Sequence, residues 1–451
     1  MKDEILSILK GIEDEGFEVA VVGGATRDIL CGIDPKDWDL TTNAVPDKIL
    51  KIFPHAFYNN KFGTVGIPVD LEETEHPHVV EVTTYRTENS YSDSRHPDEV
   101  SWGTSLDEDL KRRDFTINAM ALRFRDGRLE EKPIDLFEGQ NDLKNKIIRT
   151  VGNPSTRFAE DALRMLRAVR FAVVLGFEIE KETKRAIIEN ASLLEKISGE
   201  RIRDELFKII DSENGDQGFF IAKELGILSK IMPELDENFN VEQKSPKRHH
   251  IYDVGTHCVM SMKHCPSRKT IVRFATLLHD VGKAKVAQIT NEGVRTFYNH
   301  EVVGAKIAKD ICDRFHISRN DRDLVFKLVR WHQFSVGEHQ TDKAIRRFIN
   351  NVGLKNVEDM MDLRIGDRLG GGLEEAESWR LKLFRTRIKD VLKKPFTVRD
   401  LKIDGQDVMK VLNIKPGPKV GEVLNKLFEE VADEKIKNER QFLLNKIGDF
   451  S

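Results

Sequence analysis

The pattern of apolar residues changes near residue 155, and this change constrains the fold more than any other feature. Before it, short β-branched and apolar runs alternate with turns; after it, apolar residues recur with a period of about 3.6 residues. The sequence therefore predicts an α+β protein, a small mixed sheet followed by an all-helical remainder. We expect strands at 17–22, 37–40, 63–69 and 79–85, and helices at 4–14, 26–30, 157–175, 181–195, 199–211 and 217–229.

The length of 451 residues is too great for a single core. We expect four domains, at 1–150, 151–240, 241–375 and 376–451. No stretch approaches the roughly 18 unbroken apolar residues of a membrane helix, and the N-terminus lacks the basic-then-apolar order of a signal peptide. Four widely spaced cysteines are typical of reduced thiols. These features predict a cytoplasmic protein that does not bind membranes.

Two aspartates, Asp37 and Asp39, stand two residues apart on a predicted strand. This spacing places both carboxylates on one face of the strand. Hard oxygen ligands suit Mg²⁺, and Glu81 on a neighbouring predicted strand is a third candidate. Polymerase-type phosphoryl transfer uses two such ions. A solvated edge strand carries the same spacing, so the pair alone does not decide between the two interpretations.

The sequence upstream of this pair favours the catalytic interpretation. Gly23 and Gly24 allow close approach of a triphosphate, Arg27 follows them, and the next helix offers free N–H groups. The string from Gly23 to Leu40 resembles the nucleotidyltransferase superfamily of polymerase β. More specifically, it resembles the bacterial and eukaryotic (class II) tRNA nucleotidyltransferases, the CCA-adding enzymes, and their poly(A) polymerase relatives.

This resemblance implies the addition of C and A to the 3′ end of tRNA from CTP and ATP, with no DNA partner. It implies catalysis by Asp37, Asp39 and Glu81 and nucleotide binding by the glycines and Arg27. The run Arg112–Met120 resembles the Arg-Arg-Asp motif of the family. The resemblance then implies that Arg113 contacts the nucleotide and that Asp114 reads the ribose hydroxyl, with Asn118 in the same nucleotide-binding set.

The string Glu160–Arg164 resembles the Glu-Asp-x-x-Arg motif of the family. If it is helical, Asp161 and Arg164 share a face. Asp161 can accept from the exocyclic amine of cytosine or adenine, and Arg164 can donate to the ring nitrogen. Guanine and uracil present the reverse order of groups, so this pair would serve as a protein template. A surface ion pair is the alternative interpretation of Asp161 and Arg164. Arg167 and Arg170 are further nucleotide-binding candidates.

The polar segment Tyr91–Asp98 resembles the flexible loop of full CCA-adding enzymes, which CC-adding relatives shorten. Residues 57–63 lack the arginines that bacterial poly(A) polymerases carry there. An A-adding enzyme is not excluded by these observations. Two further alternatives are a phosphohydrolase whose N-terminal part only docks tRNA, and a non-catalytic tRNA-binding factor.

A second group of ligand-type residues lies in the helical part. The pair His279–Asp280 ends an apolar helix and resembles the signature of an HD-family metallophosphohydrolase, with the other ligand positions filled. Such a nitrogen and oxygen set suits Mn²⁺, Fe²⁺, Ni²⁺ or Zn²⁺ better than Mg²⁺. The resemblance implies hydrolysis of phosphate esters at 241–375 and a tRNA-binding tail at 376–451. The expected ligands are His257, His279, Asp280, His300, His332 and Asp367.

Overall fold

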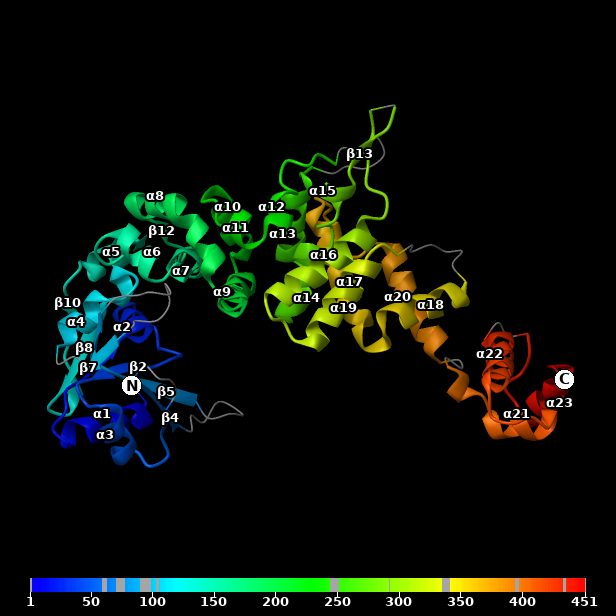
Figure 1. Cartoon of the computed structure of the whole chain (residues 1–451), viewed down its shortest axis with the longest axis horizontal. Helices are drawn as coiled ribbons and strands as arrows, with labels where there is room; N and C mark the ends of the chain where they lie inside the picture. Colours follow the sequence, from blue (N-terminus) through cyan, green and yellow to red (C-terminus); the bar gives the residue numbers. More distant parts are fainter. Residues whose placement is uncertain are drawn as a thin grey trace. The chain divides into compact units, whose positions relative to one another are not determined.

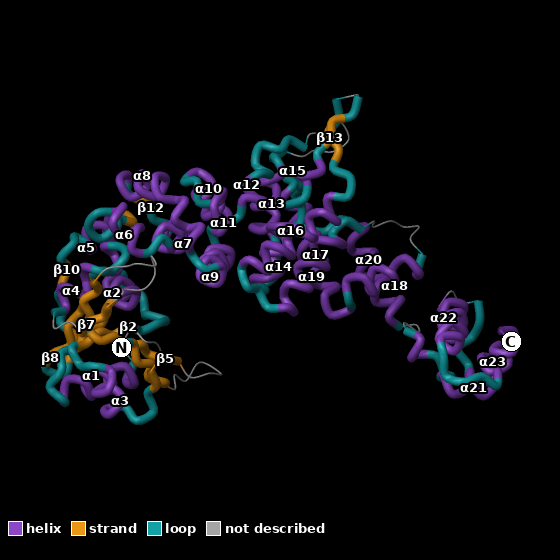
Figure 2. The backbone as a smooth tube through the Cα atoms, in the orientation of Figure 1, coloured by secondary structure: helices purple, strands orange, loops and turns teal. Residues whose placement is uncertain are grey.

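The computed structural model describes residues 2–58, 63–69, 78–89, 99–102, 105–243, 251–291, 293–334, 341–393, 397–432 and 435–450. The chain divides into two compact units, residues 1–236 and 237–451. Strands gather in the first part of the chain and helices make up most of the remainder (Figure 2). The predicted α+β fold class is therefore confirmed.

The first unit begins with an eight-stranded mixed sheet in the order β10-β8-β1-β2-β5-β4-β3, with β9 paired to β8 (Figure 1). The central pair β2 and β5 is parallel, whereas β1 is antiparallel to both β2 and β8. The strands are β1 (Val19–Val22), β2 (Asp39–Thr42), β3 (Phe57–Tyr58), β4 (Thr64–Val69), β5 (His78–Thr84), β8 (Met120–Arg125), β9 (Arg128–Leu129) and β10 (Ile134–Asp135).

Both faces of the sheet are covered at β1, whose alternate residues point to opposite sides and are all buried. Val19 and Val21 join a core with the helices α1 (Asp3–Asp14) and α3 (Pro46–Ile52). Ala20 and Val22 join a second core with α4 (Leu106–Lys111). Continuous burial explains why β1 is an unbroken apolar run. The remaining elements of this region are α2 (Gly23–Leu30), η1 (Thr116–Asn118), α5 (Gly139–Asn145) and the hairpin β6 (Arg86–Asn89) with β7 (Glu99–Trp102).

The rest of the first unit is helical except for the two-residue pair β11 (Ile147–Ile148) and β12 (Glu178–Ile179). Two of the expected helices are each two helices in the structure. The helix expected at 217–229 is interrupted at residues 225–227, where Gly226 has a φ of +72°, and the helix expected at 157–175 is interrupted at residues 161 and 162. Asp161 is extended, with φ −148° and ψ 102°. The helices are α6 (Pro154–Glu160), α7 (Leu163–Leu175), α8 (Lys181–Asn190), η2 (Ala191–Lys196), α9 (Gly199–Asp211), α10 (Gly215–Glu224), α11 (Leu228–Ile231) and α12 (Pro233–Asp236).

Where the structure describes it, the second unit is helical apart from the hairpin β13 (Gln288–Ile289) with β14 (Arg295–Thr296). A group of helices after residue 397 has its own apolar core, which includes Leu401, Leu427 and Leu443. The elements are α13 (Val254–His264), α14 (Thr270–Leu278), α15 (Lys283–Val286), α16 (His300–Arg314), α17 (Arg319–Trp331), α18 (Asp342–Val352), η3 (Leu354–Asn356), α19 (Val357–Gly370), α20 (Trp379–Leu392), η4 (Val398–Asp400), α21 (Gly405–Leu412), α22 (Pro418–Ala432), α23 (Arg440–Ile447) and η5 (Gly448–Phe450).

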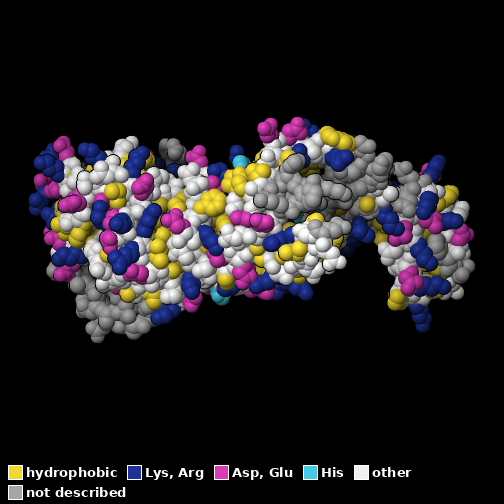
Figure 3. Space-filling model, turned by 90° about the horizontal axis from the view of Figure 1, so that it is seen from above, with side chains coloured by type: hydrophobic (Ala, Val, Ile, Leu, Met, Phe, Trp, Pro, Cys, Tyr) yellow, Lys and Arg dark blue, Asp and Glu magenta, His cyan; other side chains and the backbone are white. Residues whose placement is uncertain are grey.

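The four cysteines are all free thiols. Cys31 is exposed at the end of α2, and Cys258, Cys265 and Cys312 are buried. Within the part of the chain that the structure describes, no helix is both long and apolar enough to cross a membrane. Basic and acidic side chains are interspersed on the face shown in Figure 3, consistent with the net charge of −4.

Candidate functional site

The first candidate site lies where β1, β2 and β5 run side by side. Asp39 is the first residue of β2 and pairs with Glu81 on the parallel strand β5. The Glu81 N–H donates to the Trp38 carbonyl over 3.2 Å, which fixes this register. Asp37 lies in the bend before β2 rather than on the strand, so the expectation that both aspartates lie on the strand is wrong for Asp37.

Burial raises the pKa of Asp39, Arg113 opposes this effect, and the charge of Asp37 raises the pKa further. The two carboxylates are therefore close enough to repel each other, an arrangement that a divalent cation relieves. Among the described residues, Asp37, Asp39 and Glu81 do not form a group whose ligand atoms all lie within 4.8 Å of one another. Mg²⁺ needs few protein ligands, because it keeps waters and substrate phosphates as its other ligands.

Gly23 permits the close approach of the strand-end aspartate. Its φ is +67°, and a Cβ added there would lie 2.9 Å from Asp39 Oδ2 and 3.2 Å from Arg113 Nη1. Any larger residue would push these two charged groups apart. Gly23 is also the first residue of α2, so the helix begins one turn earlier than the sequence pattern predicts.

The Arg-Arg-Asp segment joins this site to the helices that follow. Asp114 is buried and accepts hydrogen bonds from the Phe115 N–H at 2.8 Å and from Arg167 Nε at 2.8 Å and Nη2 at 2.5 Å. Burial alone would raise the pKa of Asp114, but Arg167 outweighs it and holds that pKa at about 2. Arg113 forms an ion pair with Asp109 at 3.1 Å, and Arg27 donates to Asn118 over 2.9 Å.

Asp161 and Arg164 are neighbours in the structure but do not share a helix face, which corrects the expected geometry. Asp161 lies between α6 and α7, and its side chain accepts from the Leu163 N–H at 3.1 Å. Arg201 on α9 also donates to both of its carboxylate oxygens, at 3.2 and 2.7 Å. The sequence pattern did not predict this contact.

Arg164 is held by other partners. Its Nη1 donates to Glu160 at 2.6 Å and to the Arg157 carbonyl at 3.1 Å. Its Nη2 donates to the Arg112 carbonyl at 3.0 Å. Arg164 therefore links the start of α7 to the Arg-Arg-Asp segment, which follows α4. Its side chain is 12% exposed and that of Asp161 is 19% exposed, so both side chains are mostly buried and keep some access to solvent.

The second candidate site is a cluster of buried ligand-type residues in the second unit. All six expected residues converge there, in two sets that share Asp280. Asp280 Oδ2 lies 3.5 Å from His257 Nε2 and 3.2 Å from His279 Nε2. Asp280 Oδ1 lies 3.1 Å from His300 Nε2 and 3.5 Å from His332 Nε2. Asp367 joins the first set, with Oδ1 3.2 Å from His257 Nε2.

The backbone fixes the direction in which three of these imidazoles point. The Nδ1 atoms of His279, His300 and His332 lie 2.7 Å from the carbonyl oxygens of residues 276, 297 and 329. Each carbonyl accepts a hydrogen bond from the Nδ1–H. In a neutral imidazole the Nε2 atom then carries no hydrogen, and its lone pair is left for a cation. This orientation is typical of metal-ligating histidines.

Close helix crossings bring the ligands of this cluster together. His257 lies on α13 and Asp367 on α19, and Gly370 of α19 lies against Ser261 of α13 so closely that an added Cβ would overlap the Ser261 backbone nitrogen. Gly282, which follows the His279–Asp280 pair, lies in the same way against the first turn of α16, where His300 begins the helix.

The electrostatics of the cluster favour a bound cation. Burial opposes protonation of His279, but the carboxylates of Asp280 and Asp367 outweigh it and raise the pKa of His279 to about 10. The pKa values of both aspartates lie well below the ordinary value, because imidazole and cationic neighbours outweigh their burial. The site therefore attracts positive charge strongly, and a divalent ion would replace the proton on His279.

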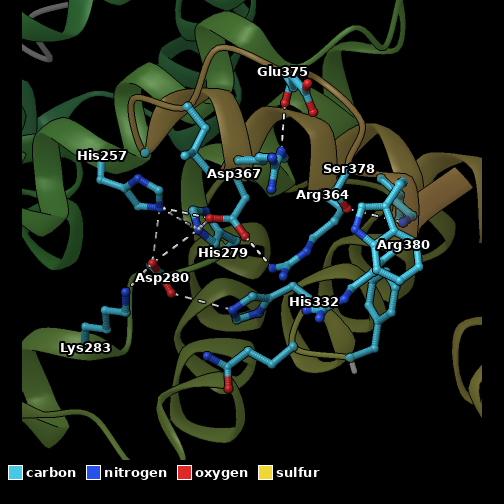
Figure 4. A pocket seen from close by; sticks show the side chains of 17 residues that line it. His257, His279, Asp280, Lys283, His332, Arg364, Asp367, Glu375, Ser378 and Arg380 are labelled. Atoms are coloured by element: carbon cyan, nitrogen blue, oxygen red, sulfur yellow. Dashed lines mark hydrogen bonds and ion pairs between the residues drawn. The ribbon is translucent and has the colours of Figure 1, made fainter. Parts of the chain in front are cut away.

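A cavity of about 920 Å³ opens beside this cluster (Figure 4). Arg364 points into it and pairs with Asp367 at 2.7 Å, while Lys283 pairs with Asp280 at 2.6 Å. Arg380 and Trp379 at the start of α20 also line it. Sequence reasoning missed these lining residues, because basic side chains of this kind are common on surface helices.

Comparisons with known proteins identify the family. Residues 19–149 match the model described as "Poly A polymerase head domain", residues 176–239 match "Probable RNA and SrmB- binding site of polymerase A", and residues 302–447 match "tRNA nucleotidyltransferase domain 2 putative". The CCA-adding enzyme of Ligilactobacillus salivarius is 34% identical over 443 residues, which cover 97% of this chain and 94% of that protein. The chain belongs to the family of CCA-adding enzymes. Members of this family are nucleotidyltransferases.

Other members of the CCA-adding family agree in sequence and structure. The CCA-adding enzyme of Limosilactobacillus reuteri is 48% identical over 218 residues, 48% of this chain and 51% of that protein. The crystal structure of the Bacillus stearothermophilus CCA-adding enzyme in complex with CTP covers 100% of this chain and 98% of its own, at 26% identity and a TM-score of 0.71. The segment Tyr91–Asp98 and most of the segment 57–63 lie outside the described residues.

Proposed function

We propose that this protein adds C and A to the 3′ end of tRNA, using CTP and ATP. The observation that carries the proposal is the convergence of Asp37, Asp39 and Gly23 at one strand end, in a chain related over nearly its whole length to CCA-adding enzymes. Bound Mg²⁺ supplies Lewis-acid stabilisation of the phosphates and of the leaving group. The aspartates provide hard oxygen ligands, and Glu81 lies beside them on β5.

The base is selected by Asp161 and Arg164 in this proposal. The Leu163 N–H and Arg201 both donate to Asp161 Oδ1, whereas Oδ2 accepts one hydrogen bond, from Arg201, and has a second lone pair for the exocyclic amine of cytosine or adenine. A carboxylate has no hydrogen to donate, so it cannot pair with the carbonyl of guanine or uracil. Arg164 exchanges one of its present contacts for the ring nitrogen of the base.

Nucleotide incorporation tests this function directly. Purified protein is incubated with Mg²⁺ and tRNA that ends before its CCA, with labelled CTP, ATP, GTP or UTP supplied singly and in pairs. We expect incorporation of C from CTP alone and completion of the CCA end when ATP is also present. Incorporation of ATP only into tRNA that already ends in CC would identify an A-adding enzyme. Long A tails would instead identify a poly(A) polymerase.

A second function is favoured by the buried cluster around Asp280. We propose that it binds two divalent transition-metal ions, bridged by Asp280, and hydrolyses phosphate esters in the adjoining cavity. Four imidazole nitrogens and two carboxylates suit Mn²⁺, Fe²⁺, Ni²⁺ or Zn²⁺. Lys283 and Arg364 place positive charge in the cavity, where an anionic ester would bind. In this proposal, residues 241–375 form an HD domain and residues 376–451 form a tRNA-binding tail.

The separation of the two activities is tested with one double variant. His279→Ala with Asp280→Ala removes ligands of both sets, so metal-dependent hydrolysis of phosphate esters is expected to be lost. CTP and ATP incorporation is expected to continue, because Asp37 and Asp39 lie in the other unit. Loss of incorporation in a folded double variant would show instead that the cluster serves nucleotide addition, and unchanged hydrolysis would exclude it as the hydrolytic site.

A further inference from the structure

Phe171 of α7 lies at the centre of three arginines of the described chain. The guanidinium carbons of Arg170, Arg167 and Arg27 lie 4.3, 5.3 and 5.9 Å from its ring centroid. The ring is 9% exposed, and the ring of Phe115 packs against it edge to face at 5.7 Å. No sequence motif considered above includes Phe171.

The three arginines come from two helices, α2 and α7, and each has an anionic partner, with Glu205 shared by Arg167 and Arg170. Arg27 lies on α2 and pairs with Asp28 at 2.7 Å. Arg167 pairs with Asp114 at 2.5 Å. Arg170 lies one turn further along α7 and pairs with Glu205 of α9 at 3.0 Å. The ring of Phe171 is the group that all three approach.

An aromatic ring can hold cations together without neutralising them. The face of the ring carries partial negative charge and attracts a guanidinium by about 0.5–2 kcal/mol, depending on how far the pair is desolvated. A carboxylate in the same place would form a salt bridge with each arginine and compete with an anionic ligand. Phe171 therefore holds the guanidinium groups close to one another without adding a further carboxylate to the three, Asp28, Asp114 and Glu205, that already pair with them.

The arginines that surround the ring also surround the strand-end site. Arg27 follows the Gly23 turn and reaches Asn118, and Arg167 reaches the buried Asp114 of the Arg-Arg-Asp segment. The charges of Arg113, Arg167 and Arg27 all lower the pKa of Asp39, so two of the three arginines act on the carboxylate at the end of β2. A polyphosphate beside Asp39 would lie within reach of the same positive field.

We propose that Phe171 is a positioning residue for polyphosphate binding, which orders Arg27, Arg167 and Arg170 into one cationic cradle. This inference rests on the proposed nucleotidyltransferase function. The ring itself touches no reacting atom in this scheme. It acts by fixing the directions of the three guanidinium planes, so that the binding of the nucleotide phosphates costs little ordering of long side chains.

The test replaces the ring and keeps an apolar side chain. In Phe171→Leu the site stays apolar but the attraction of the ring is gone, so we expect the KM for both CTP and ATP to rise about tenfold, with kcat nearly unchanged. Phe171→Tyr keeps an aromatic ring and should restore most of the wild-type KM. Thermal unfolding of each variant shows whether the fold is retained.

Binding of inorganic tripolyphosphate, measured by calorimetry without tRNA, separates this inference from the function on which it rests. We expect its Kd to rise about tenfold in Phe171→Leu and to recover in Phe171→Tyr. Wild-type protein that binds tripolyphosphate but adds no nucleotide would overturn the proposed function and leave the role of Phe171 standing. Equal Kd values for wild-type and Phe171→Leu, or a fall in kcat with an unchanged KM, would overturn the role of Phe171.

Discussion

Arg201 of α9 donates to both carboxylate oxygens of Asp161, over 3.2 and 2.7 Å, across the boundary between α6 and α7. A bidentate pair of this kind fixes the plane of the carboxylate as well as its position. Asp161 therefore presents its remaining lone pairs in a defined direction. The base selection that we propose depends on this direction, because a tilted carboxylate would accept from any nearby donor.

Replacing Arg201 should relax base selection without stopping catalysis. Arg201→Met keeps an unbranched apolar stem but loses both hydrogen bonds, so incorporation of CTP relative to UTP should fall about tenfold, as for the loss of one bidentate contact. The measurement is single-nucleotide incorporation with each of the four nucleotides. Arg203→Met on the same helix is the control, since Arg203 pairs with Asp204 and not with Asp161. Equal selectivity in both variants would contradict the orienting role.

Replacing either strand-end aspartate should stop nucleotide addition. Asp39→Ala or Asp37→Ala removes a hard oxygen ligand, and we expect a loss of at least about a thousandfold in kcat for CTP and ATP, with tRNA affinity retained. Gel-shift and incorporation assays on the same preparation separate binding from chemistry. Asp34→Ala, an exposed carboxylate in the same loop, is the control. Substantial residual addition by the double variant Asp37→Ala with Asp39→Ala would exclude the metal-binding role.

A single added methyl group on α19 should weaken the second metal site. In Gly370→Ala the new Cβ overlaps Ser261 of α13, so the two helices that carry Asp367 and His257 must move apart. We expect metal affinity, measured by titration with Mn²⁺ or Ni²⁺, to fall about ten- to a hundredfold, as for other changes that misorient ligands. Gly371→Ala is the control, because a Cβ added there would lie 3.4 Å from the nearest atom, which is ordinary van der Waals contact. Identical affinities for the two variants would show that the crossing does not position the ligands.

Acid should remove the stabilisation that Asp114 provides. Its pKa in the folded protein is about 2, below the ordinary aspartate value of 3.8, so the ionised group stabilises the fold at neutral pH. That contribution is complete above about pH 5 and is lost as the pH falls through 4 towards 2. We expect the difference in thermal midpoint between wild-type and Asp114→Asn to shrink over this interval. A difference that stays constant from pH 5 to pH 2.5 would contradict the charged pairing with Arg167.

The parts of the fold that follow from local patterns were predictable from the sequence. The run Val19–Val22 is apolar because both faces of the sheet are covered, and the positions of β4 and β5 follow from their β-branched residues. The six residues of the second site were expected from the resemblance to the HD family, and the structure brings them together in two sets that share Asp280.

The break between α6 and α7 shows what local patterns leave out. Apolar periodicity continues through residues 157–175, so nothing in the spacing marks a boundary. The chain leaves the helix because Asp161 caps the next turn through the Leu163 N–H and is held from α9 by Arg201. The first contact follows from the preference of aspartate for capping helix N-termini, which can be inferred from the sequence. The second depends on a residue forty positions away, and only the tertiary structure places it.

The contrast between the one exposed thiol and the three buried ones has a practical use. Thiolates, not thiols, react with maleimides, and burial raises the pKa of Cys258, Cys265 and Cys312. Cys31 alone among the cysteines combines exposure with a position at the end of α2, the helix that begins at Gly23 and carries Arg27. A fluorophore attached to the native protein would therefore sit at one known point, at the far end of the helix whose first residue, Gly23, lies at the strand-end site. Its emission can be recorded while nucleotide and tRNA are added, without any engineered cysteine.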